Sequence, residues 1–415
     1  MVTVDPLADE VHRWVDDHWD PDLPVRDWWS MIADAGWSKP QLPWEHGGRA
    51  LPPKAEATVR KVFEARGALP PPGGLGHLMA APTLVAEGSA EQIARFVPSI
   101  LHGTVGWCQL FSEPGSGSDM AAATTTAVRD GDRYVVTGQK VWTSQAMESD
   151  FGMLLARTDW DAPKHRGLSW IVMPLDQPGV EIRPLREMTG RSYFNEVFLD
   201  GAVCAAEDVV GGEGNGWRVA QTTLRYEKAG IGPDGTFSML PHPGAKGGNL
   251  DKRAGDAIGG EVVAFPRLEI ADLIALARAR GVADEPSVRQ GIAQLVAMKR
   301  TAVWNTRRAR AAAGTGEALG VASLGKVAGH RIALHTTAIA THIGGPAATL
   351  AGADGLLDGL LTEATLTSAA ARIGGGTDEI QKNVIAERVL GLPRDAGPQD
   401  VPFRDLPRNT KGLSA

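Results

Sequence analysis

The order of sequence patterns along this chain of 415 residues predicts an α+β protein of two or three domains. Apolar residues recur at three- and four-residue spacing up to about residue 105, which is typical of helices. Short runs rich in β-branched and aromatic residues extend from Gly106 to about Gly216, and long helical patterns return after Trp217. Helices and strands do not alternate, which argues against a Rossmann fold or an α/β barrel.

The N-terminal part predicts four helices. Their expected ranges are Val11–Trp19, Val25–Ala35, Lys54–Arg66 and Glu91–Leu101. Ser89 and Gln92 have the spacing of a capping box before the last of these helices. Proline-rich breaks at Leu51–Pro53 and Leu69–Gly74 separate the others.

The middle part predicts strands and the C-terminal part predicts helices again. The expected strands are Tyr134–Trp142, Phe151–Ala156, Leu168–Met173 and Val197–Leu199. The expected helices are Trp217–Ile231, Leu268–Arg280, Val288–Ala313, Val321–Ile343 and Glu379–Leu390. Between the first two of these helices, the segment Gly230–Gly260 has many glycines and little periodicity. A loop of this length is usually functional or disordered.

Composition and charge exclude several classes of protein. A net charge of −7 gives no electrostatic reason to expect nucleic acid or an anionic membrane as partner. Two cysteines exclude a disulfide scaffold and a zinc site built from thiolates, and the ten histidines lack metal-ligand spacing. No apolar run approaches the roughly 18 residues of a membrane helix, and the start lacks the pattern of a signal peptide. We therefore expect a cytoplasmic protein without a bound metal.

Two short motifs have an ordinary structural interpretation. Gly320–Lys326 has the glycine and lysine spacing of a phosphate loop, but Val327 stands where a Ser or Thr is needed and the context is helical. Its Ser323-x-x-Lys326 match to penicillin-binding enzymes lacks the companion motifs. Gly212–Gly216 has the wrong spacing for a dinucleotide fingerprint, so we interpret it as a turn.

Three segments have residue types suited to binding a cofactor. Trp107–Asp119 combines glycines and hydroxyl side chains, which could form a backbone nest for phosphate or flavin oxygens. Gly138–Ser144 places an indole beside two hydroxyls, and Arg372–Gln381 is a glycine-lined entry into a helix. Each segment taken singly is also compatible with a turn, a core tryptophan or a helix cap.

Taken together, these segments resemble the signatures of the acyl-CoA dehydrogenase family, and the resemblance covers the chain to about Arg394. Ser112–Asp119 is similar to the family's Thr/Ser-Glu-Pro-Gly-x-Gly-Ser-Asp motif. Asp130–Ser144 and Gly375–Pro393 match its second and its C-terminal signature, in the right order and spacing. Three long motifs in order are highly specific.

The resemblance implies an N-terminal helical domain, a middle β-barrel or sandwich domain and a C-terminal helical bundle. We expect these at residues 1–106, 107–218 and 219–393, with the glycine-rich insertion at 230–260 inside the bundle and a tail at 394–415. The resemblance also implies FAD bound between the last two domains. It further implies a homo-oligomer, usually a dimer or a dimer of dimers, and electron transfer to an electron-transfer flavoprotein.

The resemblance also implies roles for individual residues. It places Gln109 to Ser118 along the flavin, Trp142 beside the isoalloxazine ring, and Ser144 where the family has a Thr that contacts the reactive nitrogen. The cofactor-binding candidates are Gln109, Phe111, Ser112, Gly117, Ser118, Trp142, Thr143, Ser144, Gly345, Thr377 and Glu379. The substrate-binding candidates are Ser118, Lys228 and Gly376.

The expected reaction is α,β-dehydrogenation of an acyl-CoA to the trans-2-enoyl-CoA, in which a carboxylate removes the α-proton. Many family members carry this base as the Glu of a Glu-Gly-Thr triplet, but Gly375 occupies that position here. A second family position lies in a Leu-x-x-Glu-Arg pattern, which corresponds to Leu224–Lys228. The resemblance therefore implies Glu227 as the catalytic base, with Lys228 in place of an Arg near the CoA moiety. A base on this helix is compatible with branched or steroid-derived acyl groups.

Two departures from the family pattern leave alternatives open. The Arg-x-x-x-Phe stretch that grips FAD across the subunit interface has no match between Gly230 and Arg280, and the usual Gln before Gly344-Gly345 is absent. The chain is similar in this respect to bacterial members that pair with a second, related subunit. The first alternative is therefore a weakly active or structural subunit of a heteromeric dehydrogenase. The second is a flavin oxidase or monooxygenase on the same fold.

Overall fold

The protein is described from a computed structural model that covers residues 5–230, 241–258, 267–311, 317–394 and 400–406. Contacts between residues divide the chain into two compact units. Unit 1 comprises residues 1–185, 192–263 and 398–415, and unit 2 comprises 186–191 and 264–397. The three-domain boundaries expected from the sequence stay a prediction, because these contacts separate only two units. No helix of the described residues is long and apolar enough to cross a membrane.

The N-terminal part of unit 1 is helical, as the sequence predicts. Its helices are α1 (Pro6–His18), α2 (Val25–Asp34), α3 (Lys54–Ala65), α4 (Ala81–Glu87) and α5 (Ala90–Leu101). The expected capping box is present at the start of α5, where Ser89 and Gln92 bond each other's backbone N–H groups. A turn of π-helix, η2 (Gly76–Ala80), leads directly into α4, which the sequence pattern does not predict.

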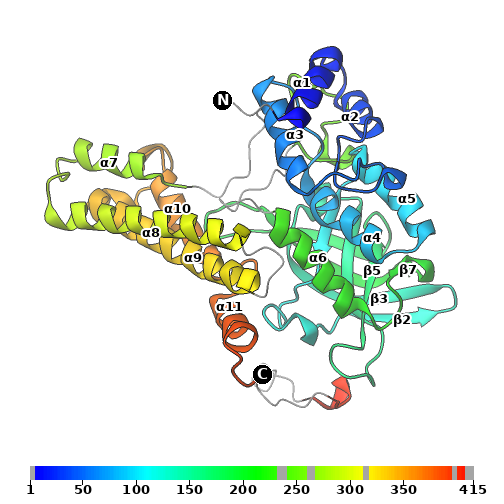
Figure 1. Cartoon of the computed structure of the whole chain (residues 1–415). Coiled ribbons are helices and arrows are strands. Elements are labelled where there is room, and N and C mark those ends of the chain that lie inside the picture. The colour runs from blue at the N-terminus through cyan, green and yellow to red at the C-terminus, as the bar shows by residue number, and fades with distance from the viewer. Residues whose placement is uncertain (1–4, 231–240, 259–266, 312–316, 395–399, 407–415) are drawn as a thin grey trace. The chain divides into compact units, whose positions relative to one another are not determined.

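The middle of unit 1 is one sheet of eight strands (Figure 1). The strands are β1 (Trp107–Leu110), β2 (Thr126–Asp130), β3 (Arg133–Ser144), β4 (Phe151–Arg157), β5 (Leu168–Pro174), β6 (Val180–Leu185), β7 (Phe194–Ala205) and β8 (Val209–Val210). Their order is β6-β7-β3-β2-β4-β5-β8, and β1 pairs with β4 in parallel. Most other pairs are antiparallel. Strand β1 also lies in contact with β3.

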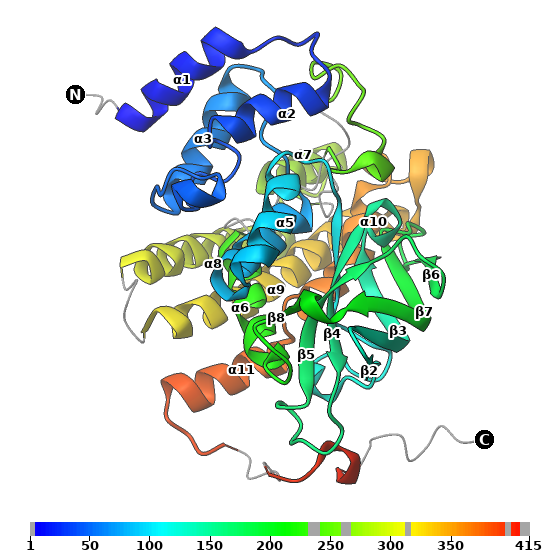
Figure 2. The ribbon, with the colours of Figure 1, turned by 90° about the vertical axis from the view of Figure 1, so that its right-hand side faces the viewer.

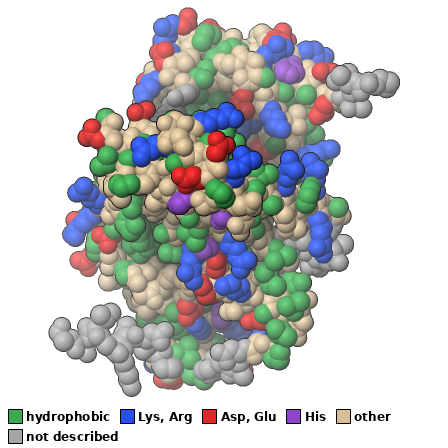
Figure 3. Space-filling view, turned by 90° about the vertical axis from the view of Figure 1, so that its left-hand side faces the viewer, with side chains coloured by type: hydrophobic (Ala, Val, Ile, Leu, Met, Phe, Trp, Pro, Cys, Tyr) green, Lys and Arg blue, Asp and Glu red, His purple; other side chains and the backbone are tan. Residues whose placement is uncertain are grey.

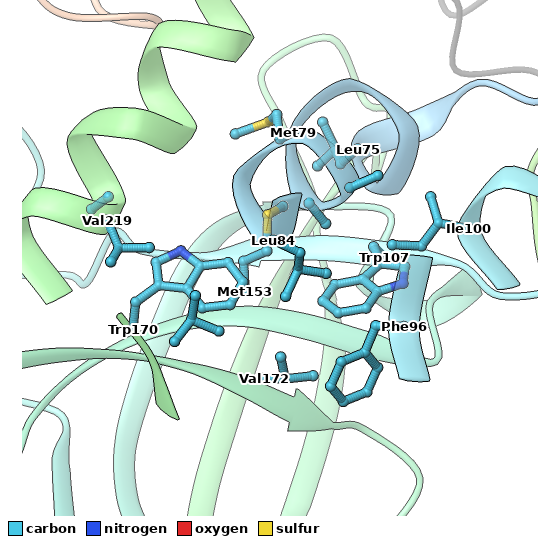
Figure 4. Packing of buried hydrophobic residues seen from close by; sticks show 14 of the residues in the cluster. Leu75, Met79, Leu84, Phe96, Ile100, Trp107, Met153, Trp170, Val172 and Val219 are labelled. Carbon is cyan, nitrogen blue, oxygen red and sulfur yellow. The ribbon is translucent and has the colours of Figure 1, made fainter. Parts of the chain in front are cut away.

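Helix α6 (Gly216–Gly230) completes the core of unit 1. It contacts β4 and β5 of the sheet as well as α4 and η2. In this core, the Trp170 indole lies near Val219 of α6, and Trp107 packs edge-on against Phe96 of α5 with ring centroids 5.8 Å apart (Figure 4). The helical N-terminal part, the sheet and α6 therefore share one hydrophobic cluster.

The middle of the glycine-rich insertion, residues 241–258, belongs to unit 1 and runs beside α2 (Figure 2). It consists of turns with one short 3-10 helix, η6 (Ala245–Gly247). Its apolar side chains Leu250, Ala254 and Ala257 are buried in the cluster that contains Trp28 and Phe63. Gly230 ends α6, and the other residues of the predicted insertion lie outside the described residues.

Unit 2 is a helical bundle. Its helices are α7 (Ile270–Ala279), α8 (Pro286–Ala311), α9 (Glu317–Gly344), α10 (Leu360–Ser368) and α11 (Asp378–Val384). Buried residues of α7 to α10, such as Leu273, Leu295, Ile343 and Leu361, form its core. The sequence pattern predicts four of these helices but not α10, and the single helix expected at Glu379–Leu390 changes to a π-helical turn at Ile385–Val389. The fold class is therefore as predicted: helical ends and a central sheet.

Candidate active site

The loop that follows β1 is fixed by a buried carboxylate. Glu113, 6% exposed, accepts hydrogen bonds from the backbone N–H of Thr124 at 2.7 Å and of Thr125 at 2.9 Å. The Lys140 ammonium of β3 lies 2.8 Å from the same carboxylate. Burial acts to raise the pKa of Glu113, but the Lys140 charge and these hydrogen bonds outweigh it and lower the pKa to about 2. The base of the loop is thus held by an ion pair that is inaccessible to solvent.

The tip of this loop is open. Gly115, Gly117 and Ser118 are exposed, and a Cβ added at either glycine would meet no atom within 4 Å. The backbone N–H groups of Gly117 and Ser118 make no hydrogen bond with another described residue. Free amides and a serine hydroxyl at a loop tip can bind phosphate or flavin oxygens, so this loop fits part of FAD.

The residues that precede the loop tip differ in burial and in their hydrogen bonds. Gln109 is half-buried on β1, opposite Met153 of β4. Phe111 is buried in the core of unit 1, so only its backbone is available, and its carbonyl accepts from Lys140 Nζ at 3.2 Å. The carbonyl of half-buried Ser112 accepts from the N–H of Val141 at 3.0 Å. These bonds join the loop to the end of β3, which carries the second group of candidates.

Trp142 to Ser144 form that end of β3. The pairing with β7 shifts its register between Lys140 and Thr143, and Trp142 between them has φ of 59°. This left-handed conformation turns the indole outward, where it is 57% exposed and packs edge-on against Phe194 at 5.6 Å. Such a flat aromatic surface fits the ring system of a flavin.

The two hydroxyls beside Trp142 differ in their surroundings. Thr143 is fully buried, and its Oγ1 has no hydrogen-bond partner among the described residues. Ser144 is half-buried opposite Phe194. The structure therefore brings the candidates from Gln109 to Ser118 and those from Trp142 to Ser144 together at one edge of the sheet.

Glu227 lies on the buried face of α6. It follows Val219 and Thr223 at intervals of four residues, and both of these side chains are fully buried. The half-buried Glu227 carboxylate makes no hydrogen bond or ion pair with another described residue. Burial raises its pKa, and the neighbouring Lys228 opposes this only in part. Lys228 itself is exposed on the next position of the helix.

The remaining candidates lie in unit 2. Thr377 caps α11, and its hydroxyl accepts from the N–H of Ile380 at 3.2 Å. Glu379 is exposed and pairs with Arg372 at 2.7 Å, which lowers the pKa of this carboxyl. Gly376 has φ of +92°, and Gly345 has φ of +55° at the start of a 3-10 turn. Thr377, Glu379 and Gly376 are neighbours on one loop and helix start, whereas Gly345 is on a separate turn.

Gly375 also has a left-handed backbone, with φ of +67°, which L side chains rarely adopt. The backbone at the position where many family members carry the base therefore favours glycine in this protein.

Sequence patterns did not reveal three polar contacts, two of them in unit 1 and one in unit 2. They are the Glu113–Lys140 pair, the contact of Gln145 with His242, and the pair of His330 Nδ1 with Asp378 Oδ2 at 2.8 Å. Lys140 and Asp378 lie within the family signatures found in the sequence, and this position could have marked them as candidates. The partners of the three contacts are 27, 97 and 48 residues apart in the chain, so spacing could not join them. No cluster of metal-ligating side chains occurs among the described residues.

Comparisons with known proteins match most of the chain. Three family models match in order: acyl-CoA dehydrogenase, N-terminal domain at residues 3–104, middle domain at 108–201 and C-terminal domain at 260–390. The chain is 37% identical over 378 residues to the acyl-CoA dehydrogenase IpdE1 of Mycobacterium tuberculosis, and the match covers 89% of both proteins.

Two solved structures are similar in fold. One is described as the Tcur3481-Tcur3483 steroid ACAD, with 26% identity, a TM-score of 0.68 and coverage of 95% of this chain and 100% of that one. The other is the ChsE4-ChsE5 complex from Mycobacterium tuberculosis, with 25% identity and the same TM-score and coverage. The chain therefore belongs to the acyl-CoA dehydrogenase family of oxidoreductases.

Proposed function

We propose that this enzyme catalyses FAD-dependent α,β-dehydrogenation of an acyl-CoA to the trans-2-enoyl-CoA, with Glu227 as the base. The observation that carries the proposal is the state of Glu227, a half-buried carboxylate with no partner among the described residues and a raised pKa. A general base is most effective when its pKa approaches the operating pH, and an unpartnered oxygen is free to accept a proton.

Each of the proposed site residues would have its own role in the reaction. Glu227 takes the α-proton of the thioester onto a carboxylate oxygen, and the ammonium of Lys228 attracts the phosphates of CoA. The free amides of Gly117 and Ser118 bind phosphate or flavin oxygens, while the exposed Trp142 indole and the Ser144 hydroxyl contact the flavin ring. Bound FAD supplies the two-electron acceptor for the β-hydrogen, which leaves as hydride. We propose an electron-transfer flavoprotein as the next acceptor.

The proposed substrate class is a branched or steroid-derived acyl-CoA. Support comes from the position of the base on α6 rather than at residue 375, and from the similar solved structure that is described as a steroid ACAD.

A second candidate function is that of a weakly active or structural subunit of a heteromeric dehydrogenase. Two observations favour it: Gly375 offers no carboxylate, and a similar solved structure is a complex of two named chains, ChsE4 and ChsE5. In this case the chain alone would bind little FAD and would gain activity only with a related subunit.

The test is Glu227→Gln in the purified protein, measured as anaerobic flavin bleaching by a panel of fatty, branched and steroid acyl-CoAs. We expect at least about a 100-fold loss of the reduction rate with normal flavin content, because a general base contributes roughly 10²–10⁴-fold. Glu91→Gln, which alters an exposed carboxylate of α5, should keep the full rate. Full reduction by the Glu227 variant would refute the assigned base. A colourless wild-type chain that becomes active with a related subunit would favour the second candidate.

A further inference from the structure

The described part of the glycine-rich insertion, residues 241–258, is bound to the rest of unit 1 at both of its ends. Near its start, the N–H of Gly244 donates to the Gly103 carbonyl at 2.9 Å, and Lys246 Nζ donates to the Ser149 carbonyl at 3.4 Å. Near its end, the N–H of Ala254 donates to the Leu23 carbonyl at 2.7 Å. With its buried apolar residues, the segment is an integral part of the fold that holds His242 in a defined place.

His242 contacts the side chain of Gln145. Both residues line a small cavity together with Gly74, Glu148 and Ser149. Burial lowers the pKa of His242 to about 4, so the ring is neutral near pH 7. An amide NH₂ group only donates, and the neutral ring therefore accepts the hydrogen bond from Gln145 Nε2 on its own Nε2.

Gln145 belongs to the turn that carries the proposed flavin contacts. Of the five non-glycine residues with positive φ among the described residues, two lie here: Trp142 at 59° and Gln145 at 58°. Backbone of this kind costs on the order of 1–3 kcal/mol per residue and persists only when its surroundings impose it. Asn195 of β7 provides one restraint, since its Oδ1 accepts from the N–H of Ala146 at 2.8 Å. The Gln145 side chain, which is almost completely buried, provides another through His242.

We propose that His242 is a positioning residue of this enzyme: by accepting the hydrogen bond from Gln145, it holds the turn from Trp142 to Gln145 in the conformation that presents the indole and the Ser144 hydroxyl. The inference rests on the proposed function for its link to the flavin. It assigns a role to the insertion that occupies the place of the missing Arg-x-x-x-Phe stretch. The insertion would act from within the same chain, at the turn beside the flavin.

The test compares His242→Ala, His242→Gln and a control, Lys252→Ala, which alters an exposed side chain of the same segment. Hydrogen–deuterium exchange of residues 142–149 reports on the turn without any cofactor, while FAD titration and the flavin absorbance spectrum report on the site. We expect His242→Ala to raise exchange in 142–149, to weaken FAD binding about five- to tenfold and to shift the spectrum, because one buried hydrogen bond is lost. His242→Gln, whose amide oxygen can accept from Gln145, should restore all three readouts, and Lys252→Ala should change none.

Unchanged exchange and an unchanged spectrum in His242→Ala would overturn the proposal. So would failure of His242→Gln to improve on His242→Ala. The double variant Gln145→Ala/His242→Ala should weaken FAD binding no more than either single variant, and additive losses would also overturn it. If the wild type binds no FAD, the proposed function fails, but the exchange data still decide whether His242 restrains the turn.

Discussion

At the scale of single residues, the charge state of Glu227 should determine how the rate of dehydrogenation depends on pH. Burial raises the pKa of this carboxyl above its ordinary value of 4.5, and Lys228 lowers it in part. A base must be ionised to accept a proton, so the rate of dehydrogenation should rise with pH through the raised pKa and then level off. Replacing Lys228 by Met removes the opposing charge and should move this rising limb to higher pH.

The measurement is the pH profile of the flavin reduction rate at saturating acyl-CoA, for the wild type and for Lys228→Met. Arg225→Met changes an exposed cation on the same helix and should leave the limb in place. A limb that stays at the same pH in Lys228→Met would contradict the coupling between Lys228 and Glu227.

Local residue patterns predicted local contacts well. The capping box of Ser89 and Gln92 is present as expected, and the α+β class follows from the order of helical and strand patterns along the chain. Thr377 caps α11 because a Thr before an Asp-Glu pair is a common helix start. The contacts of His242 with Gln145 and of His330 with Asp378 depend on chain topology that periodicity does not contain. Whether the thirteen binding candidates contact FAD or substrate, and whether Glu227 is the base, stays a prediction.

At the scale of elements, the Glu113–Lys140 pair joins the loop after β1 to strand β3. Lys140 Nζ is fully buried and also donates to the carbonyls of Phe111 at 3.2 Å and Leu155 at 2.7 Å. Lys140→Met would leave the Glu113 carboxylate buried without its cation. We expect a loss of about 3–5 kcal/mol in the free energy of unfolding, because breaking one partner of a buried pair leaves an uncompensated charge.

This pair also predicts a response to acid. The pKa of Glu113 is about 2 in the folded protein and near 4.5 when unfolded, so folding favours the ionised form. Its stabilising contribution is therefore fully present above about pH 4.5 and is lost as the pH falls toward 2. Urea unfolding at several pH values should show this loss in the wild type, and a smaller one in Lys140→Met. Arg133→Met breaks an exposed pair with Asp130 and should lower the free energy of unfolding far less than Lys140→Met does. An equal cost for both variants would contradict the role of burial.

The sequence patterns predict some of the strands and helices and miss others. β3, β4 and β5 stand out by their β-branched residues, whereas β1, β2, β6 and β8 were not predicted, since two to six residues give too little pattern. Helix α10 was missed for a related reason: its nine residues contain three threonines and only two fully buried positions. Short elements are specified by the neighbours on which they pack.

At the scale of the whole molecule, the exposed apolar side chains of unit 2 are candidates for contact with another protein chain. Hydrophobic side chains occur between charged ones of both signs on one face of the protein (Figure 3). Among the described residues of unit 2, the exposed large apolar side chains are Met188, Val303, Trp304, Leu324, Leu334, Leu350, Leu357, Ile373, Val389, Leu390 and Leu392. Single exposed apolar residues are normal on a protein surface, but large aromatic residues are enriched where a surface binds another protein chain. We propose that Trp304, the one tryptophan among these residues, lies in the interface with a second copy or with a related subunit.

The prediction concerns Trp304, which is 61% exposed on α8. Trp304→Glu should shift the protein toward the monomer, because a charge buried in an apolar interface costs several kcal/mol. Light scattering after size-exclusion chromatography measures the mass of the chain alone, and native mass spectrometry identifies a co-expressed related subunit. Trp44→Glu is the matched control, since Trp44 of unit 1 is 63% exposed and its loss should not change the mass. A wild-type mass equal to one chain, both alone and beside the related subunit, would contradict the interface. A dimer that survives Trp304→Glu would place that interface elsewhere.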